Sequence, residues 1–429
     1  MKKFLFYLAA FTCVATLSLS FFGCGSAKPA KNDDSSTASP TENGDIFKYD
    51  STENQNAWVI TGIEKENGDG ILEIPEMIEE KPVTEILSLD YRPNNEEKSL
   101  HFTEIKCLKI PQNIKFISPY LCRNMLGLQE VVFSEESLVE KLEGTFQGCK
   151  NLHSIHLPTS LKQIFSQTFE DCEALTCLAL PKSVKYISAI SLKNSGIVDL
   201  AVDLENAYFS AVNNVLYDKQ LTQLIYYPEK KPEEEFTVLD SVTEISVYAF
   251  SNCKALKRID LNNVEIIRKM SFAGCENLAE ITAENLKYVD GEYVFDETAW
   301  YKNYQGGEIS LGKVLLSYKK FAFALDLSGY VSIAPYAFKG HTDLHRITFD
   351  YELTSIGNGA FMDCVNLYEV IFNSRAIMVF IGSNVFENNA PNRYFKVYKS
   401  LFTDNPNNFN NYANNIFWQP YKDSIRTFE

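Results

Sequence analysis

The stretch SVTEISVYAFSNCKALKRIDL, residues 241–261, has close copies elsewhere in this chain. LKQIFSQTFEDCEALTCLAL covers residues 161–180, VEIIRKMSFAGCENLAEIT covers 264–282, and LTSIGNGAFMDCVNLYEVIF covers 353–372. A chemical site needs its residues once, whereas a fold built by stacking needs the same pattern in every layer. The repetition therefore indicates architecture.

Aligned copies share columns of apolar residues about 22 residues apart, a period within the range of leucine-rich repeats. The first column is aliphatic: Leu142, Ile164, Ile187, Ile245, Ile267, Val289, Ile333, Ile356 and Ile381. Five residues later most copies carry an aromatic: Phe169, Phe250, Phe272, Phe338, Phe361 and Phe386. Three residues further lies a cysteine column, with His341 and Asn389 as exceptions: Cys149, Cys172, Cys253, Cys275 and Cys364. We interpret these cysteines as buried free thiols, because side chains in one column point the same way.

Each copy ends in a segment such as LKRIDL (residues 256–261) or LHRITF (344–349), which alternates apolar and variable residues like a β-strand. The connection between these strands is too short for a full crossover helix and predicts a short helical or 3₁₀ turn. One copy buries too few side chains to offset its own ordering entropy, so copies must stack. The sequence predicts a solenoid with a parallel sheet on one face and turns and loops opposite.

The motif IxxxAFxxCxxLxxIxLP resembles the BspA-type (Treponema-pallidum-type) leucine-rich repeat of bacterial surface proteins. The resemblance extends to two inserted β-hairpins, near 206–232 and 300–320, whose turns we assign to Asn213-Asn214 and Gly306-Gly307. It also extends to an aromatic end that resembles the terminal cap of this family. The expected organisation is a signal peptide (1–23), a flexible tether (24–45), an N-terminal capping region (46–115), repeats (116–395) and a C-terminal cap (396–429).

The segment MKKFLFYLAAFTCVATLSLSFFGCG combines two lysines, an apolar run from Phe4 to Phe22, and then Gly23-Cys24. This order is typical of a bacterial export signal, although the run is nearly long enough for a retained membrane anchor. It resembles a lipoprotein signal, in which the cysteine after a small residue becomes the lipid-carrying N-terminus. Phe21 departs from the aliphatic residue that such signals prefer. The resemblance implies lipidation at Cys24, with secretion or a retained anchor as alternatives.

A formal charge of −16 argues against nucleic-acid binding, because such a chain repels phosphate backbones and the sequence contains no strong basic patch. His341 and His345 are spaced for a metal only if they are helical, and both fall in the repeat pattern instead. The sequence also contains no Ser-His-Asp arrangement, phosphate-binding glycine loop or zinc-protease motif. We therefore predict no catalytic residues, no metal and no cofactor.

Function is expected in the variable columns, whose residues flank the inward aliphatic of each strand and face outward. The candidate binding surface comprises His156, Arg258, Asp260, Glu280, Thr282, Arg346 and Thr348. These residues share no single chemistry, so a solvated face without a ligand is the alternative interpretation.

The family resemblance implies a lipid-anchored binding protein of the bacterial cell envelope, surface-exposed or periplasm-facing, that adheres to an extracellular protein or glycan. A second hypothesis is an accessory glycan-binding lipoprotein, suggested by tyrosines that we expect to be exposed in the inserted hairpins: Tyr208, Tyr226, Tyr227, Tyr301 and Tyr304. A third hypothesis, a hydrolase, has no catalytic motif in its favour.

Overall fold

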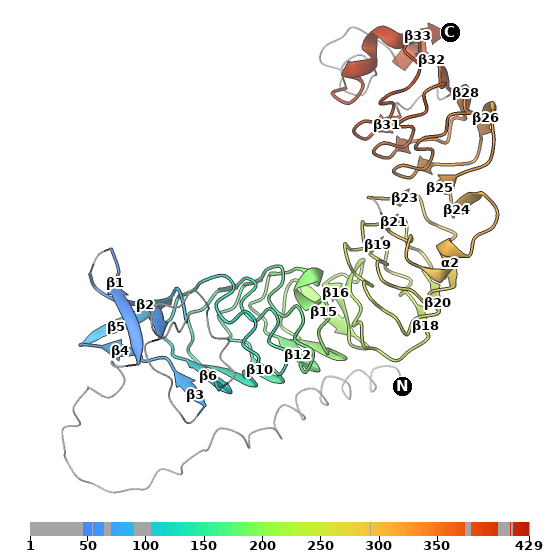
Figure 1. Ribbon diagram of the computed structural model, residues 1–429. Coiled ribbons are helices and arrows are strands. Elements are labelled where there is room, and N and C mark those ends of the chain that lie inside the picture. The colour runs from blue at the N-terminus through green and yellow to red at the C-terminus, as the bar shows by residue number, and fades with distance from the viewer. Residues whose placement is uncertain are drawn as a thin grey trace, which may run out of the picture. The chain divides into compact units, whose positions relative to one another are not determined.

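The computed structural model describes residues 46–53, 55–63, 70–89, 104–291, 293–373, 379–401, 412 and 415–428. Cys24 and the predicted signal and tether lie outside these residues. The chain divides into two units. The N-terminal unit comprises the residues up to Leu221 together with Ile225–Lys231, and the C-terminal unit comprises Thr222–Leu224 together with the residues from Pro232 onward. Each unit is a solenoid, as the repeat pattern predicts (Figure 1).

In both units a regular coil contains one long strand, formed by the LxxIxL segment, and one short strand. The long strands of the N-terminal unit are β3 (Ile71–Glu73), β6 (Cys107–Ile110), β8 (Glu130–Phe133), β10 (Ser154–His156), β12 (Cys177–Leu180) and β14 (Asp199–Val202). Its short strands are β7 (Phe116–Ile117), β9 (Lys141–Leu142), β11 (Gln163–Ile164) and β13 (Tyr186–Ile187). Parallel pairing joins β3, β6, β8 and β10 in sequence order, so successive coils stack in register.

The first part of the N-terminal unit adds β1 (Phe47–Ser51), β2 (Trp58–Ile63), β4 (Met77–Ile78) and β5 (Lys81–Ile86). β1 and β2 form an antiparallel pair, and β5 joins β2 to the short strand β7 by parallel pairing. β3 and β6 lie within the region 46–115 that the sequence assigns to the N-terminal cap, and they already pair like coil strands.

The long strands of the C-terminal unit are β18 (Glu235–Thr237), β20 (Arg258–Asp260), β22 (Glu280–Thr282), β26 (Ala324–Leu327), β28 (Arg346–Phe349), β30 (Glu369–Phe372), β32 (Tyr394–Tyr398) and β33 (Ile425–Phe428). Its short strands are β19 (Glu244–Ile245), β21 (Ile266–Ile267), β23 (Tyr288–Val289), β27 (Ser332–Ile333), β29 (Ser355–Ile356) and β31 (Phe380–Ile381). β26, β28, β30, β32 and β33 form one parallel sheet in sequence order.

Both inserted hairpins are present. β15 (Phe209–Val212) and β16 (Val215–Asp218) turn at Asn213-Asn214, as predicted, and both asparagines have positive φ. β24 (Glu308–Leu311) and β25 (Val314–Tyr318) turn instead at Gly312-Lys313, so the assignment of that turn to Gly306-Gly307 is wrong. Gly312 has φ +55°, and Leu311 pairs with Val314 across the turn. The strand β17 (Gln223–Tyr226) follows the first hairpin.

Helix is scarce among the described residues: the 3₁₀ segments η2 (Ala189–Leu192), η3 (Lys399–Leu401) and η4 (Gln419–Ser424), and the α-helix α2 (Ala299–Lys302). Most connections between strands are turns with residues in the left-handed region. Tyr248 (φ 61°) and Asn252 (φ 58°) are four residues apart in one such turn, which prevents helical continuity. The residue before the cysteine column is left-handed in many coils, and it is then Gly, Asn or Asp: Gly148, Asp171, Asn252, Gly274, Gly340, Asp363 and Asn388.

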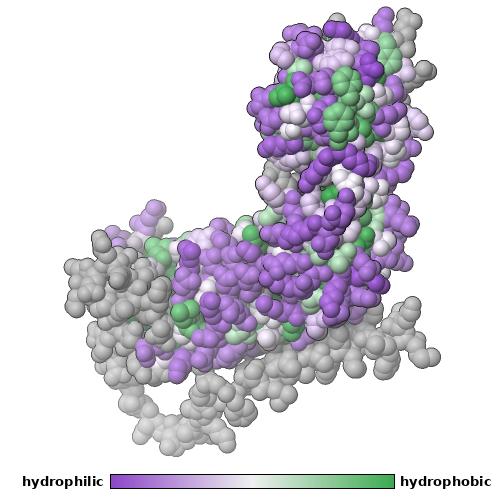
Figure 2. Space-filling view, turned by 45° about the vertical axis from the view of Figure 1, so that its right-hand side comes forward, coloured by the Kyte–Doolittle hydropathy of each residue, from purple (hydrophilic) through white to green (hydrophobic). Residues whose placement is uncertain are grey.

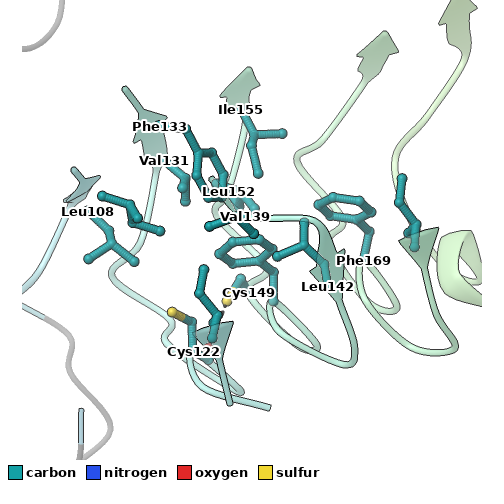
Figure 3. Close-up of a cluster of buried hydrophobic side chains, with 14 of the residues drawn as sticks. Leu108, Cys122, Val131, Phe133, Val139, Leu142, Cys149, Leu152, Ile155 and Phe169 are labelled. Carbon is teal, nitrogen blue, oxygen red and sulfur yellow. Dashed lines mark hydrogen bonds between the residues drawn. The ribbon is translucent and has the colours of Figure 1, made fainter. Parts of the chain in front are cut away.

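The predicted columns form the core. All nine aliphatic residues of the first column are buried, and the aromatic rings stack coil on coil, with centroids 5.0 Å apart for Phe250 and Phe272 and 4.8 Å apart for Phe338 and Phe361. Figure 3 shows the same arrangement in the N-terminal unit, where Leu142, Cys149 and Phe169 point into the interior.

The cysteine column has a hydrogen-bonding role that the sequence does not reveal. Its thiols are buried, and several donate to a backbone carbonyl of the preceding coil: Cys149 to Cys122 (3.0 Å), Cys172 to Phe146 (3.2 Å), Cys275 to Phe250 (2.9 Å) and Cys364 to Phe338 (3.1 Å). The two exceptions bond similarly, since Asn389 donates to the carbonyl of Phe361 (2.6 Å) and His341 Nε2 lies 2.7 Å from that of Lys320. The residues of this column therefore share a side-chain donor that satisfies a backbone carbonyl of the preceding coil.

The last coil is covered by aromatic side chains. Trp418 and Tyr412 are fully buried, and the Trp418 indole donates to the carbonyl of Val379 (2.8 Å). The Tyr412 hydroxyl accepts a hydrogen bond from the Val379 amide (3.1 Å). These bonds satisfy backbone groups of the final coil. The chain resumes the sheet at β32 and β33, so residues 396–429 combine coil strands with this cover.

Candidate binding surface

The seven candidate residues all lie on long strands, on the side opposite the inward aliphatic. His156, Arg258, Glu280, Thr282 and Arg346 are exposed, and Asp260 and Thr348 are half-buried. His156 belongs to the N-terminal unit and the other six to the C-terminal unit. Parallel pairing brings Arg258 beside Glu280 and Asp260 beside Thr282.

The middle coils, formed by β18, β20 and β22, carry an exposed charge ladder. Arg258 Nε lies 2.8 Å from Glu280 Oε2, and Arg258 Nη1 lies 3.7 Å from Glu235 Oε1. The hydrogen bond to Glu280 raises the pKa of Arg258, so this guanidinium stays charged. More than half of each of these three side chains is exposed, so solvent screens the ladder.

The last coils present a different arrangement around Glu369, which is 1% exposed. Lys396 Nζ and the Tyr394 hydroxyl each lie 2.8 Å from Glu369 Oε1, and Arg346 Nε bonds to Glu369 Oε2. The Arg426 guanidinium lies over the Tyr394 ring, 3.9 Å from its centroid. We call Arg346, Glu369, Tyr394, Lys396 and Arg426 the Glu369 cluster.

Burial and the hydrogen bonds from its partners shift the pKa of Glu369 in opposite directions. Desolvation alone would raise the pKa of the carboxyl, but hydrogen bonds from Lys396, Tyr394 and Arg346 outweigh it and lower the pKa to about 2. The cluster therefore holds one buried anion beneath two cations, Arg346 and Lys396, and the third cation, Arg426, lies over the Tyr394 ring. Its outer surface is positively charged in a chain of net charge −16.

A row of rings borders this cluster where the chain enters the long strands. Phe323 stacks on His345 with centroids 4.2 Å apart, His345 meets Tyr368 edge-on at 6.2 Å, and Tyr368 meets Tyr394 at 6.5 Å. Phe323 is 57% exposed and the other rings are half-buried. Aromatic rings and arginines are the side chains that most often contribute strongly to protein interfaces.

Two expectations about exposure are wrong. Tyr226 and Tyr227, expected on the surface of the first hairpin, are 2% and 1% exposed. They come at and after the end of β17, which places their rings inside the solenoid, and the Tyr226 hydroxyl donates to the carbonyl of Leu192 (3.4 Å). Tyr208 and Tyr304 are exposed as expected, and Tyr301 is half-buried.

Among the described residues, no group of three or more His, Cys, Asp or Glu side chains is placed to hold a metal ion. No helix within the described ranges is long and apolar enough to cross a membrane. On the face shown in Figure 2 hydrophilic residues dominate, and hydrophobic residues form small separate patches.

Comparisons with known proteins agree with this repeat architecture. The model of the BspA-type leucine-rich repeat region matches residues 96–216, 228–324 and 328–425, in six copies. A comparison with curated protein sequences gave no significant match.

Several solved structures are similar to this chain. The pneumococcal vaccine antigen PcpA is 20% identical over 90% of this chain and 96% of its own, with a TM-score of 0.49. A leucine-rich cell surface protein of Faecalibacterium prausnitzii is 18% identical over 80% of this chain and 96% of its own, with a TM-score of 0.34. A leucine-rich repeat protein of T. pallidum is 18% identical over 60% of this chain and 87% of its own, with a TM-score of 0.27.

The family model covers most of the chain, and residues of the aliphatic, aromatic and cysteine columns lie in both hydrophobic core clusters. This chain belongs to the BspA-type leucine-rich repeat family.

Proposed function

We propose that this protein binds an extracellular protein through the outward face of its last long strands, with the Glu369 cluster at the centre. The observation that carries the proposal is the burial of Glu369 beneath Arg346 and Lys396. The carboxylate fixes both cations in place, so less side-chain entropy remains to be lost on binding. The neighbouring rings add apolar contact area beside the charges.

The chemistry of this face favours an acidic partner surface. Arg346 and Arg426 are exposed, and Lys396 is half-buried, whereas the carboxylate that bonds to Arg346 and Lys396 is covered. Charge complementarity would speed association and select against basic partners. The F. prausnitzii protein is described as a cell surface protein, and we include a place at the cell surface and an adhesive role in the proposal for this chain.

The test uses the unaltered protein and two purified variants as bait on extracts of host or neighbouring cells. Arg346→Ala/Arg426→Ala removes two cations of the cluster, and Arg258→Ala removes one cation of the middle coils. A genuine partner should be captured equally by the unaltered protein and by Arg258→Ala, and about ten-fold less by the double variant. If the double variant and Arg258→Ala captured the partner equally well, the binding face would not include the Glu369 cluster.

We further propose that Cys24 carries the lipid that holds the protein at the cell surface, on the sequence pattern alone. Cys24→Ala should leave the precursor unprocessed or release the protein from membranes, because the acyl chains would have no attachment point. Detergent partitioning of cells that express each form measures this. Normal processing and unchanged partitioning of Cys24→Ala would contradict lipidation.

A further inference from the structure

The second inserted hairpin shortens one coil of the C-terminal unit. In regular coils the aliphatic column lies 13 residues before the first residue of the long strand, as from Ile333 to Arg346 or from Ile356 to Glu369. Leu315 occupies the same column, because it pairs with Ile333, yet the chain reaches the long strand at Ala324 after only 9 residues. This coil therefore lacks part of the turn that its neighbours have.

A cavity of about 470 Å³ lies beside this short coil. Its lining comes from the short coil, the preceding coil and the following coil, and includes Leu316, Ser317, Val294, Phe295, Pro335 and Tyr336. The stacked rings are interrupted at the same level. Phe272 stacks on Phe295, and Tyr318 stacks on Phe338, but within the described residues no ring contact joins Phe295 to Tyr318.

Tyr293 shows how the cavity differs from a regular coil junction. Elsewhere a left-handed tyrosine lies over a glycine of the next coil: a Cβ added to Gly144 would lie 2.3 Å from the Tyr120 ring, and one added to Gly359 would lie 2.5 Å from the Tyr336 ring. Tyr293 is also left-handed, but the short coil follows it, and its side chain is 60% exposed at the cavity.

The charged residues that line the cavity are two lysines and one aspartate. Lys319 and Lys339 line it, and in the part of the chain that the structure describes neither forms an ion pair. Lys339 Nζ lies 5.2 Å from the centroid of the Tyr336 ring, so a cation and a ring share one wall. Asp296, which is acidic, and the hydroxyl-bearing residues Tyr301 and Ser317 also line the cavity.

We propose that this cavity binds a sugar residue that bears a carboxylate. Its volume lies in the range of small-ligand pockets, whose linings combine aromatic walls with a few polar groups. The Tyr293 and Tyr336 rings suit the C–H faces of a pyranose, Asp296 and the hydroxyl groups suit its hydroxyls, and the two lysines suit its carboxylate. This site is separate from the Glu369 cluster and does not depend on the proposed protein partner.

Calorimetric titration of the full chain with D-glucuronic acid, and with D-glucose as the neutral match, tests the proposal. The acid should bind about ten-fold more tightly than glucose, and added salt should weaken its binding. Lys319→Ala/Lys339→Ala should lower the affinity for glucuronate about ten-fold. The control Lys313→Ala removes a lysine of the same hairpin that pairs with Glu352 (3.0 Å) outside the cavity, and should leave binding unchanged.

Tyr293→Ala gives a second measurement that does not depend on charge. Removal of this exposed ring should weaken glucuronate binding about ten-fold without lowering the thermal midpoint of unfolding. Tyr351→Ala, at a 70% exposed tyrosine that does not line the cavity, is its control. No binding of glucuronate, equal binding of glucose, or unchanged binding by the lysine double variant would overturn the proposal.

Discussion

The middle and last coils of the C-terminal unit carry the same pair of residue types at equivalent positions, with opposite consequences. Arg258 pairs with Glu280 across β20 and β22, and Arg346 pairs with Glu369 across β28 and β30. Glu280 is exposed, whereas Glu369 is covered by Lys396 and Tyr394 of β32. Position within the repeat therefore sets which face a side chain occupies, and the next coil sets how strongly its charge contributes to stability.

The difference in burial predicts a large difference in stability. Glu369→Ala should lower the free energy of unfolding by about 3 kcal/mol, because it leaves Arg346, Lys396 and Tyr394 without their shared acceptor. This is the low end for a broken buried pair, since about half of each cation's side chain is exposed. Glu280→Ala is the matched control and should cost within about 0.5 kcal/mol.

Urea unfolding of the two variants and the unaltered protein, followed by circular dichroism, measures both changes. Equal costs for Glu369→Ala and Glu280→Ala would break the comparison, because burial would then contribute nothing to the strength of the pair.

The low pKa of Glu369 predicts a dependence of stability on pH. Its pKa is about 2 in the folded chain and about 4.3 in an unfolded one, so its stabilisation is complete above about pH 5 and is lost as pH falls toward 2. After allowance for solvent screening of the half-exposed cations, the loss should be about 2 kcal/mol.

Glu369→Gln isolates this effect, because the amide does not titrate and still offers an acceptor to Tyr394. Unfolding free energies of the unaltered protein should decline with falling pH more steeply than those of the variant. Parallel curves for the two proteins would show that Glu369 does not titrate differently in the folded chain.

The repeating parts of this molecule can be predicted from the sequence because each recurs. One misplaced column would contradict every other copy, so the burial of Ile245, Phe250 and Cys253 follows from alignment alone. The short strands could not be predicted in this way, because a strand of two residues is too short to show an alternating pattern. The left-handed residue before the cysteine column leaves a signal, the recurrence of Gly, Asn or Asp, that identifies it once the structure is known.

Features that depend on a neighbouring coil could not be predicted. Alternation along β30 places Glu369 outward, but its burial comes from Tyr394 and Lys396, 25 and 27 residues later in the chain. The Gly306-Gly307 pair has the composition of a turn, yet strand pairing selects Gly312. The short coil beside the cavity likewise lacks part of a turn, and an absent segment leaves no residue pattern of its own.

Charge reversal in the exposed ladder of the middle coils should change the free energy of unfolding least, in contrast to the loss of the buried Glu369 carboxylate. Arg258→Glu/Asp260→Lys/Glu280→Lys reverses three charges on two adjacent strands, and the total cost should stay below about 1 kcal/mol because exposed charges are screened. Asp260 should account for most of this cost, because its carboxylate accepts a hydrogen bond from the backbone N–H of Asn262 (3.0 Å) in the turn after β20.

In this triple variant the side chains at positions 258 and 280 can form the same ion pair with the two charges exchanged, while Glu235 loses its cation. Salt should therefore change the stability of the variant and of the unaltered protein by similar small amounts. Urea unfolding at low and high salt measures this. A cost of about 3 kcal/mol, equal to that of Glu369→Ala, would mean that the ladder is as strongly coupled to the fold as the buried carboxylate, and exposure would no longer distinguish the two faces.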